Sequence, residues 1–208
     1  MSVSDLYFQK TKRRYFMNIT HLSNLPSIIQ NGLLSYNIAQ SYEHQSIALE
    51  NVQARRHLKR VTNGLLLHDY ASLYFDARNP MLFYLKNHPE KVDIEELCIL
   101  IVDSDVVEFD GTVITDGNAA SGITKFLPPA EGIETLHFQD VFAKYWNDDD
   151  PFVKEEKARK RCAEVLVPNN IPYDYILGAI VPSFQTKQKM LEMGFDKRIK
   201  VSEEMFFL

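Results

Sequence analysis

Residues 163–167 read Ala-Glu-Val-Leu-Val, a run of apolar and β-branched residues with one acidic side chain, Glu164, near its start. This pattern predicts a short buried strand that begins at a carboxylate. Comparable strand-like runs lie at 15–20, 97–103 and 176–181. The segments between them include several with helical spacing, and the chain contains no internal repeat. The sequence therefore predicts an α+β domain with mostly short strands.

Helices are predicted where apolar residues recur at helical spacing beside a start or stop signal. Asn79 and Pro80 supply the cap and the first residue of one helix, and Ser183 can cap the last one. The predicted helices cover residues 23–31, 47–60, 79–85, 141–145, 154–161 and 183–193.

Further strands are predicted in two regions. Residues 107–115 contain β-branched residues on both sides of Asp110-Gly111, which predicts a hairpin turn. Residues 198–201 and 205–207 are strand candidates at the end of the chain.

Length and composition limit the number of domains. The chain has 208 residues, of which 45% are hydrophobic. This content can bury one sizeable core, so residues 1–208 are expected to form a single domain. The longest apolar run, 97–102, is far shorter than the roughly 20 residues that a membrane helix needs. We therefore expect a cytoplasmic protein that has no membrane partner.

Familiar catalytic signatures are absent from the sequence. It has no Walker loop and no GxGxxG, HExxH or GxSxG motif, and its six histidines lack the spacing of metal ligands. The two cysteines, Cys98 and Cys162, lie 64 positions apart (162 minus 98). These observations argue against a metal enzyme, a disulfide framework and a Rossmann dehydrogenase.

Positive charge is concentrated in two blocks, although the net charge is −5. The first block spans residues 55–60, and the second spans 154–161, where Glu155 and Glu156 interrupt the lysines and arginines. Charge alone favours a solvated helix face for each block. A local basic groove on an acidic protein can still bind nucleic acid, so charge does not decide between the two interpretations.

Six short motifs with polar residues in unusual settings follow one another along the chain. In order, they are Asn18–Leu25, Ser46–Ala48 with Arg55-Arg56, His68–Leu82, Thr115–Ala119, Tyr145-Trp146 and Ala163–Val167. Each motif alone has an ordinary structural explanation, such as a turn, a cap or a surface arginine. As an ordered set, from about residue 15 to the C-terminus, they resemble the DarT family of DNA ADP-ribosyltransferases.

The resemblance implies a fold and a function. The fold is that of a single-domain ADP-ribosyltransferase of the diphtheria-toxin and PARP-like type, with short-stranded central sheets and peripheral helices. The function is that of a toxin that transfers ADP-ribose from NAD to a base of single-stranded DNA. A toxin of this kind implies a partner that removes the modification, a DarG-like macrodomain antitoxin. No metal is implied.

Glu164 and Arg56 are the predicted catalytic residues. The resemblance places Glu164 at the catalytic glutamate of the family, where a carboxylate can stabilise the oxocarbenium-like ribose and accept a proton from the attacking base. Arg56 is predicted to grip the diphosphate of NAD, because a guanidinium offers a planar fork that stays charged. The sequence does not separate Arg56 from its neighbour Arg55 in this role.

Further donor-binding residues are implied on the first predicted strand. Asn18, Thr20 and His21 match the NAD-binding strand of the family, and Tyr74 is favoured over Tyr70 for stacking on nicotinamide. Well-known members carry a histidine where Asn18 stands. An amide can donate and accept hydrogen bonds there, but it cannot act as an acid or base near neutral pH.

The acceptor is assigned to a second group of residues. Arg78 and Met81 belong to the most distinctive motif, and Tyr145 and Trp146 lie in the segment that corresponds to the acceptor loop of such enzymes. Cys162 stands two residues before Glu164, at a position that helps to choose the acceptor and that is glutamine in many members. These five residues are predicted to contact DNA.

The predicted acceptor base is thymidine, with guanosine as the second choice. Two alternatives stay open at this point. The chain can be an ADP-ribosyltransferase that modifies RNA or protein, or it can be a catalytically silent module that binds nucleic acid or NAD.

Overall fold

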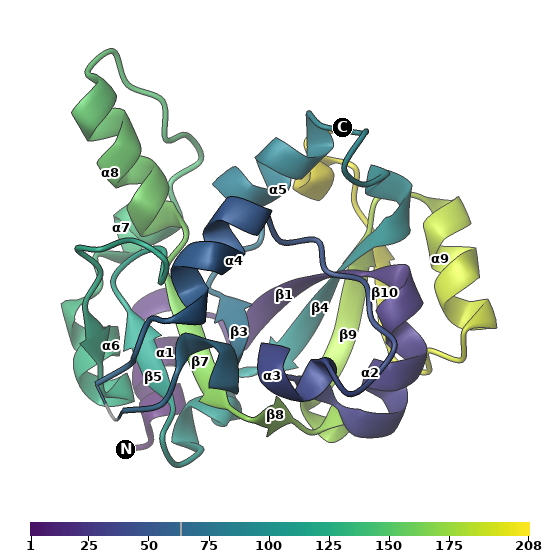
Figure 1. Ribbon diagram of the computed structural model, residues 1–208, viewed down its shortest axis with the longest axis horizontal. Helices are drawn as coiled ribbons and strands as arrows, with labels where there is room; N and C mark the ends of the chain where they lie inside the picture. Colours follow the sequence, from purple (N-terminus) through teal and green to yellow (C-terminus); the bar gives the residue numbers. More distant parts are fainter. Residues whose placement is uncertain (63) are drawn as a thin grey trace.

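An eight-stranded sheet forms the centre of the computed structural model, which describes residues 1–62 and 64–208 (Figure 1). β9 and β10 pair in parallel, and the other described neighbours pair antiparallel. In spatial order the strands are β10 (Arg198–Val201), β9 (Ile176–Val181), β4 (Leu97–Asp103), β1 (Tyr15–His21), β3 (Tyr70–Tyr74), β7 (Glu164–Pro168), β5 (Val113–Thr115) and β6 (Phe126–Leu127). A second, two-stranded sheet pairs β2 (Leu33–Leu34) with β8 (Asn170–Ile171).

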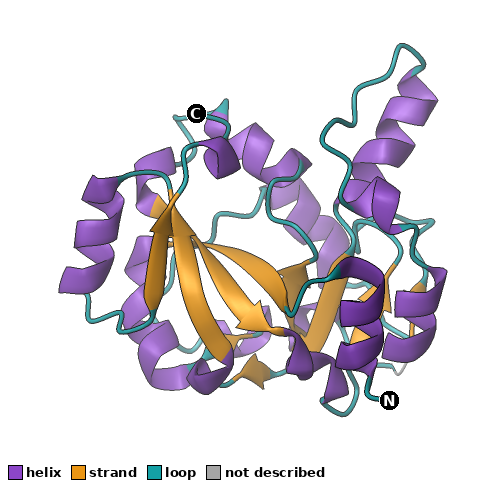
Figure 2. Ribbon diagram, turned by 180° about the vertical axis from the view of Figure 1, so that it is seen from behind, coloured by secondary structure: helices purple, strands orange, loops and turns teal. Residues whose placement is uncertain are grey.

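Helices surround the central sheet, as the views from the two sides show (Figures 1 and 2). They are α1 (Val3–Thr11), α2 (Leu25–Asn31), α3 (Tyr36–Ala39), α4 (Glu50–His57), α5 (Pro80–Lys86), α6 (Pro129–Thr135), α7 (Phe138–Val141), α8 (Pro151–Arg161) and α9 (Phe184–Glu192). Among the described residues, no helix is both long enough and apolar enough to cross a membrane. α8 and the loop before it project from the body of the domain (Figure 1).

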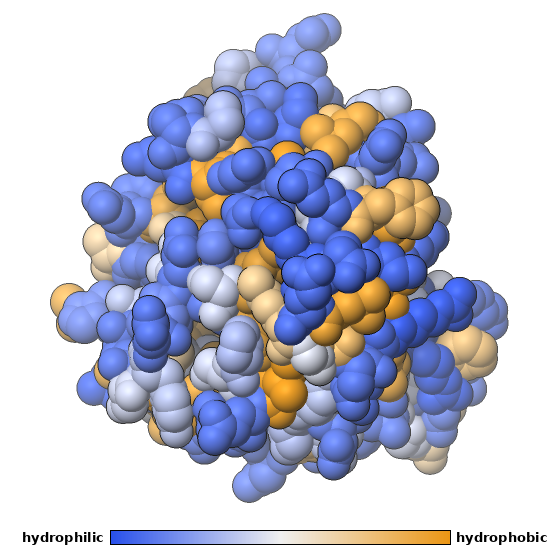
Figure 3. Space-filling view, turned by 90° about the vertical axis from the view of Figure 1, so that its right-hand side faces the viewer, coloured by the Kyte–Doolittle hydropathy of each residue, from blue (hydrophilic) through white to orange (hydrophobic). Residues whose placement is uncertain are grey.

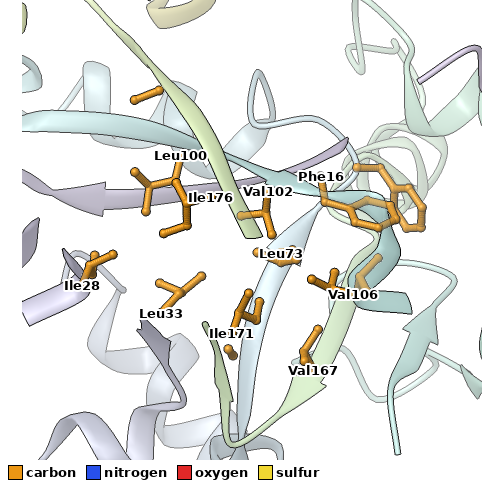
Figure 4. Close-up of a cluster of buried hydrophobic side chains, with 14 of the residues drawn as sticks. Phe16, Ile28, Leu33, Leu73, Leu100, Val102, Val106, Val167, Ile171 and Ile176 are labelled. Atoms are coloured by element: carbon orange, nitrogen blue, oxygen red, sulfur yellow. The ribbon is translucent and has the colours of Figure 1, made fainter. Parts of the chain in front are cut away.

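The sheet separates the two largest of the three hydrophobic clusters of the described residues, called here the larger and the smaller core, because side chains alternate along its strands. On β4, Cys98 and Leu100 contribute to the larger core, whereas Leu97 and Ile99 contribute to the smaller one. The larger core also takes in Phe16, which lies beside Leu73 and Val106 in the close-up of Figure 4. The near-continuous apolar run of β4 therefore reflects a strand that is buried on both faces.

The smaller core connects the sheet to α5 and the C-terminus. Leu82 and Leu85 of α5 pack with Phe206 against strand residues of this core. On the opposite side, Tyr7 of α1 is fully buried and packs against Phe16, with ring centroids 4.8 Å apart. The first strand is thus held from both faces, which fixes the site residues that it carries.

The outer surface is mostly hydrophilic on the face seen in Figure 3, where apolar side chains form small separate patches. α9 lies on this side of the molecule and contributes Phe184 and Leu191, which are exposed. Scattered apolar residues of this kind are ordinary on a folded surface.

Most predicted elements are present in the structure. The fold is the expected mixture of a central sheet and peripheral helices, with strands at 15–21, 97–103 and 176–181. The predicted caps are confirmed as well. The Asn79 side chain accepts hydrogen bonds from the amides of Met81 and Leu82, and Ser183 accepts one from Thr186.

The predicted hairpin at 107–115 is wrong. Ser104–Glu108 forms a 3₁₀ helix in which Val107 is buried, and only Val113–Thr115 is a strand. Thr112 donates both its amide and its hydroxyl back to this segment, to the carbonyls of Phe109 and Val106. The strand that follows, β5, pairs with β7 on one side and with β6 on the other, and not with residues 107–109.

Other boundaries differ from the prediction. Glu204–Phe206 is a 3₁₀ helix and not a strand, because Phe206 turns into the smaller core. The helix predicted at 47–60 is shorter, Glu50–His57, and it has no side-chain cap. The helix predicted at 141–145 is wrong, because the observed helix α7, Phe138–Val141, shares only Val141 with it. The sequence also failed to predict the helices α1, α3 and α6 and the strands β2, β3, β6 and β8.

Candidate active site

Glu164 is the first residue of β7, an interior strand of the sheet between β3 and β5, and is only 1% exposed. It lies opposite Tyr74 of the neighbouring strand β3. Its backbone amide donates a hydrogen bond of 2.9 Å to the hydroxyl of Thr115, the last residue of β5. Its Oε1 accepts a hydrogen bond of 2.8 Å from the amide of Ala119. A buried carboxylate needs such partners, and this one comes from the loop that follows β5.

Arg56 provides the other partners of this carboxylate. Its Nη1 lies 3.1 Å from both carboxylate oxygens of Glu164, and its Nη2 lies 3.1 Å from Oε2 and 2.8 Å from the hydroxyl of Ser72. The Arg56 side chain is 12% exposed, whereas Arg55 is exposed. The turn of α4 therefore directs Arg56 and not Arg55 to the catalytic glutamate that the sequence predicts.

Glu164 and Arg56 lie on the wall of a cavity of about 460 Å³. β1 and β3 contribute to its walls, together with α4, the beginning of α5 and the segment that includes α2 and α3. A cavity of this size is in the range that binds small molecules and cofactors. The lining is largely apolar, with polar groups at a few places that include Glu164, Arg56 and Ser72.

Besides Arg56, three of the predicted donor residues line this cavity: Asn18, Thr20 and Tyr74. Asn18 donates to the Ser72 carbonyl at 3.0 Å, while its own Oδ1 is buried without a hydrogen-bond partner. Tyr74 donates to the sulfur of Met81 at 3.0 Å. Burial, followed by the charge of Glu164, raises the pKa of Tyr74 well above its usual value, so the phenol remains a hydrogen-bond donor at neutral pH.

His21, in contrast, does not line the cavity. Its Nδ1 accepts a hydrogen bond from the Ser23 amide at 3.1 Å and lies 2.8 Å from the Ser23 hydroxyl, so the ring caps the short 3₁₀ helix Leu22–Asn24. Burial lowers the pKa of His21, which favours the neutral ring. A role of His21 in NAD binding stays a prediction, and its direct partners in the structure are structural ones.

Two of the predicted acceptor residues, Met81 and Cys162, also line the cavity. Cys162 caps the C-terminal end of α8, two residues before Glu164, and is buried. Burial is the main cause that raises the pKa of the Cys162 thiol to about 12. The side chain therefore faces the cavity as a neutral, weakly hydrogen-bonding group.

Arg78, Tyr145 and Trp146 lie outside the cavity lining. Arg78 donates to the carbonyl of Glu204 at 3.0 Å and stacks over the ring of Phe207, 4.2 Å from its centre. Trp146 contacts the ring of Phe207 edge to face, whereas Tyr145 is 72% exposed. The predicted contacts of these three residues with DNA stay predictions, and they would require DNA to extend beyond the cavity.

Sequence reasoning missed several residues that build the cavity. His68 is buried, its Nε2 lies 2.8 Å from Gln53 Oε1, and its ring packs against Tyr36 with centroids 4.2 Å apart. Ser72 and the Ala119 amide are further partners of the catalytic pair. The presence of His68, Ser72 and Ala119 within or beside recognised motifs was a signal, but which atoms meet depends on the tertiary fold.

The described part of the chain holds no group of three or more histidine, cysteine or acidic residues placed to bind a metal ion.

The fold agrees with that of solved ADP-ribosyltransferases. The structure of DarT from Thermus sp. 2.9 in complex with ADP-ribosylated ssDNA superposes with a TM-score of 0.81 at 26% identity, over 93% of this chain and 96% of that one. The same protein has also been solved in complex with NAD+, and that structure shows the same fold. The class defined by the fold is thus the ADP-ribosyltransferase domain.

The family follows from the sequence comparisons. The family model described as "ssDNA thymidine ADP-ribosyltransferase, DarT" matches residues 17–207. A DNA ADP-ribosyl transferase of Thermus sp. (strain 2.9) is 29% identical over 85% of both chains. A DNA ADP-ribosyl transferase–glycohydrolase fusion protein of Thermosipho africanus is 30% identical over 97% of this chain, which spans about half (51%) of the length of that protein. The chain belongs to the DarT family.

Proposed function

We propose that this chain transfers ADP-ribose from NAD to a base of single-stranded DNA and releases nicotinamide. The observation that carries the proposal is Glu164, a buried carboxylate held by three nitrogen donors on the wall of a cavity large enough for a dinucleotide fragment. Membership of the DarT family and the DNA and NAD+ complexes of a relative support the same reaction.

In the proposed reaction, the bond between C1' of the ribose and the nicotinamide nitrogen breaks, and its electron pair leaves with nicotinamide. The ribose then carries positive charge, which the nearby Glu164 carboxylate stabilises. A ring nitrogen of the base forms the new bond to C1', and its proton passes to Glu164. The three donors matter because they fix the carboxylate before the charge develops, so little reorganisation is needed during the reaction.

Arg56 has two roles to reconcile in this reaction. Its predicted role is to bind the diphosphate of NAD, but in the structure its guanidinium is engaged with Glu164 and Ser72. Binding of the diphosphate would require Arg56 to loosen this pair. We infer that Arg56 orients Glu164 in the free protein and that any contact with the diphosphate is gained on NAD binding.

The acceptor is proposed to be a base of single-stranded DNA, with thymidine first and guanosine second. In a duplex, the Watson-Crick edge of a base is paired, and removing the base from the stack costs a few kcal/mol. An enzyme that modifies a nitrogen on that edge should therefore prefer single strands. The family description, which names thymidine, supports the first choice. Because Cys162 is a neutral thiol and a weak hydrogen-bonding group, other side chains have to contribute to base selection.

We further propose that the protein acts as a toxin in the cytoplasm and that a DarG-like macrodomain reverses its modification. The Thermosipho africanus relative carries a DNA ADP-ribosyl glycohydrolase in the same chain, which supports a partner of this kind. Co-expression with such a macrodomain should restore growth to cells that produce the transferase, and a failure to restore it would contradict this pairing.

The proposed reaction is tested by incubation of the protein with labelled NAD and separate pools of single-stranded DNA, duplex DNA, RNA and protein. Label should enter single-stranded DNA, and Glu164→Gln should prevent it. Label in RNA or protein alone would establish a different acceptor class. Absence of both labelling and nicotinamide release, with NAD still bound, would indicate a catalytically silent binding module and would overturn the proposal.

A further inference from the structure

The loop of residues 116–125, between β5 and β6, holds one oxygen of Glu164 through its backbone. Its Ala119 amide donates to Oε1 of Glu164 at 2.8 Å. The position of this amide depends on the conformation of the loop. The loop is closed internally by Thr124, whose hydroxyl donates to the Asn118 carbonyl at 2.8 Å, and by Lys125, whose amide donates to Asp116 at 2.9 Å.

Arg159, in the last turn of α8, ties this loop to the projecting helix. Its Nη1 lies 3.0 Å from Asp116 Oδ1 and 3.2 Å from the Thr124 hydroxyl, so it holds both ends of the loop. Its Nε and Nη2 bind the carboxylate of Glu156 at 2.7 and 2.8 Å. The Arg159 side chain is only 10% exposed. It therefore does not belong to a solvated basic face, although it stands within a basic block.

Gly117 shows how closely the guanidinium is packed against the loop. A Cβ atom at this position would lie 2.2 Å from Nη1 of Arg159 and 2.9 Å from its Cζ, and the three nearest atoms all belong to that side chain. In addition, the backbone carbonyl of Arg159 accepts a hydrogen bond of 2.9 Å from the Asn118 amide, beside Ala119. The side chain and the backbone of one residue thus contact the loop on both sides of Gly117.

We propose that Arg159 is a positioning residue for the transfer reaction, which couples α8 to the catalytic carboxylate through the loop 116–125 and the Ala119 amide. The proposal rests on the proposed function of Glu164. It also gives α8 a second role. The helix carries exposed side chains, and through Arg159 it keeps the Ala119 amide in position to donate to Oε1 of Glu164.

Two substitutions test this coupling from opposite sides of the same contact. Arg159→Ala removes the guanidinium but keeps the backbone hydrogen bond to Asn118. Gly117→Ala keeps the guanidinium but displaces it. Each should lower the kcat of transfer about tenfold, with the KM for NAD changed less than about twofold, because a small displacement of a catalytic group affects the chemical step most. Arg159→Lys, which retains the charge and one contact, should fall between wild type and Arg159→Ala.

The double variant gives the sharpest result. Once Arg159 is alanine, the atoms that a Cβ at position 117 would meet are gone, so Gly117→Ala should have no further effect in that background. Gly122→Ala is the matched control, because Gly122 belongs to the same loop and has nothing within 4 Å of its Cβ position. It should behave as wild type.

Hydrogen exchange provides a readout that does not depend on activity. The Ala119 amide should exchange faster in Arg159→Ala and Gly117→Ala than in wild type or Gly122→Ala. A wild-type kcat in Arg159→Ala, unchanged Ala119 exchange, or losses that multiply in the double variant would overturn the proposal. A wild-type protein that transfers nothing to DNA would instead refute the proposed function, and the exchange measurement would still decide whether Arg159 holds the loop.

Discussion

The two basic blocks look alike in the sequence, yet the structure uses them differently. On α4, Arg56 turns into the cavity and binds Glu164 directly, while Arg55 faces solvent. On α8, the side chains of Arg159 and Arg161 are largely buried, while Lys154 stays exposed. The position of a basic residue around its helix, and not the number of charges, determines whether it serves chemistry, structure or solvent.

Arg161 is the clearest case of a structural role within a basic block, because its buried guanidinium binds backbone carbonyl groups. Its guanidinium donates to the carbonyls of Val141, Ala143 and Arg78. Burial lowers its pKa, the nearby Asp76 opposes this effect, and the three carbonyls satisfy its donors. Arg161 thereby joins the end of α8, next to Cys162, to two other parts of the chain, residues 141–143 and Arg78. Arg56 of the α4 block thus contacts Glu164 directly, whereas Arg159 of the α8 block contacts the loop that carries the Ala119 amide.

The largest expected effect on the rate of transfer is that of a substitution at Glu164, the partner of Arg56. Glu164→Gln preserves the volume and can still accept from Ala119, but it lacks the negative charge. It should lower the kcat of transfer by about a thousandfold or more, because the lost interaction operates in the transition state. NAD affinity should stay within a few fold in calorimetry. A variant that modifies DNA at the wild-type rate would refute the assignment of the catalytic residue.

The next largest effect is expected at Arg56. If Arg56 contacts the diphosphate of NAD, Arg56→Ala should weaken NAD binding by about 1.5 to 3 kcal/mol, and Arg56→Lys should not fully restore it because the fork is lost. Arg55→Ala, on the exposed side of the same turn, is the control and should bind NAD as wild type does. If Arg56→Ala lowers kcat and leaves the dissociation constant unchanged, Arg56 acts only by orienting Glu164.

A smaller effect, on selectivity, is expected at Cys162. Cys162→Gln introduces an amide that can donate and accept hydrogen bonds beside Glu164, so it should change the preferred base or flanking sequence more than it changes NAD hydrolysis without acceptor. Mass mapping of modified sites on homopolymer and mixed oligonucleotides measures this. Identical site patterns for both proteins would show that acceptor choice is made elsewhere, with Arg78 and the segment around Tyr145 as the remaining candidates.

The smallest effect is expected on the exposed side of α8. Lys154→Ala should weaken the binding of single-stranded DNA by less than about 1 kcal/mol and reduce the salt dependence of that binding by about one phosphate contact. The NAD affinity should not change. Lys187→Ala on α9 serves as the control for the loss of one positive charge. An equal change in DNA binding for both variants would show that α8 is not part of the DNA path.

The sequence predicts those features of the fold and the site that are determined by residues close together in the chain. The strand at Glu164, the cap at Asn79 and the helix after Ser183 carry local signals, and all three are present. The choice between Arg55 and Arg56 depends on how α4 lies against the sheet. The sequence did not determine this, and it also predicted a longer helix than the observed Glu50–His57.

Non-local contacts explain the rest of the differences. The predicted hairpin failed because Val113 pairs with Leu166 of β7, far away in sequence. The Ala119 amide could not be assigned because any residue can supply a backbone donor, so the residue type carries no signal. The role of Arg159 could not be predicted either, because the charged residues around it in sequence are typical of a solvated helix face.

The most direct test of the proposed transfer is a mass measurement on a single-stranded oligonucleotide that contains all four bases, after reaction with NAD and the wild-type protein. We expect one ADP-ribose on a base, thymidine first, for each nicotinamide released, with little modification of the same sequence in a duplex. Release of nicotinamide without a DNA adduct, or equal modification of single strand and duplex, would contradict the proposed transfer.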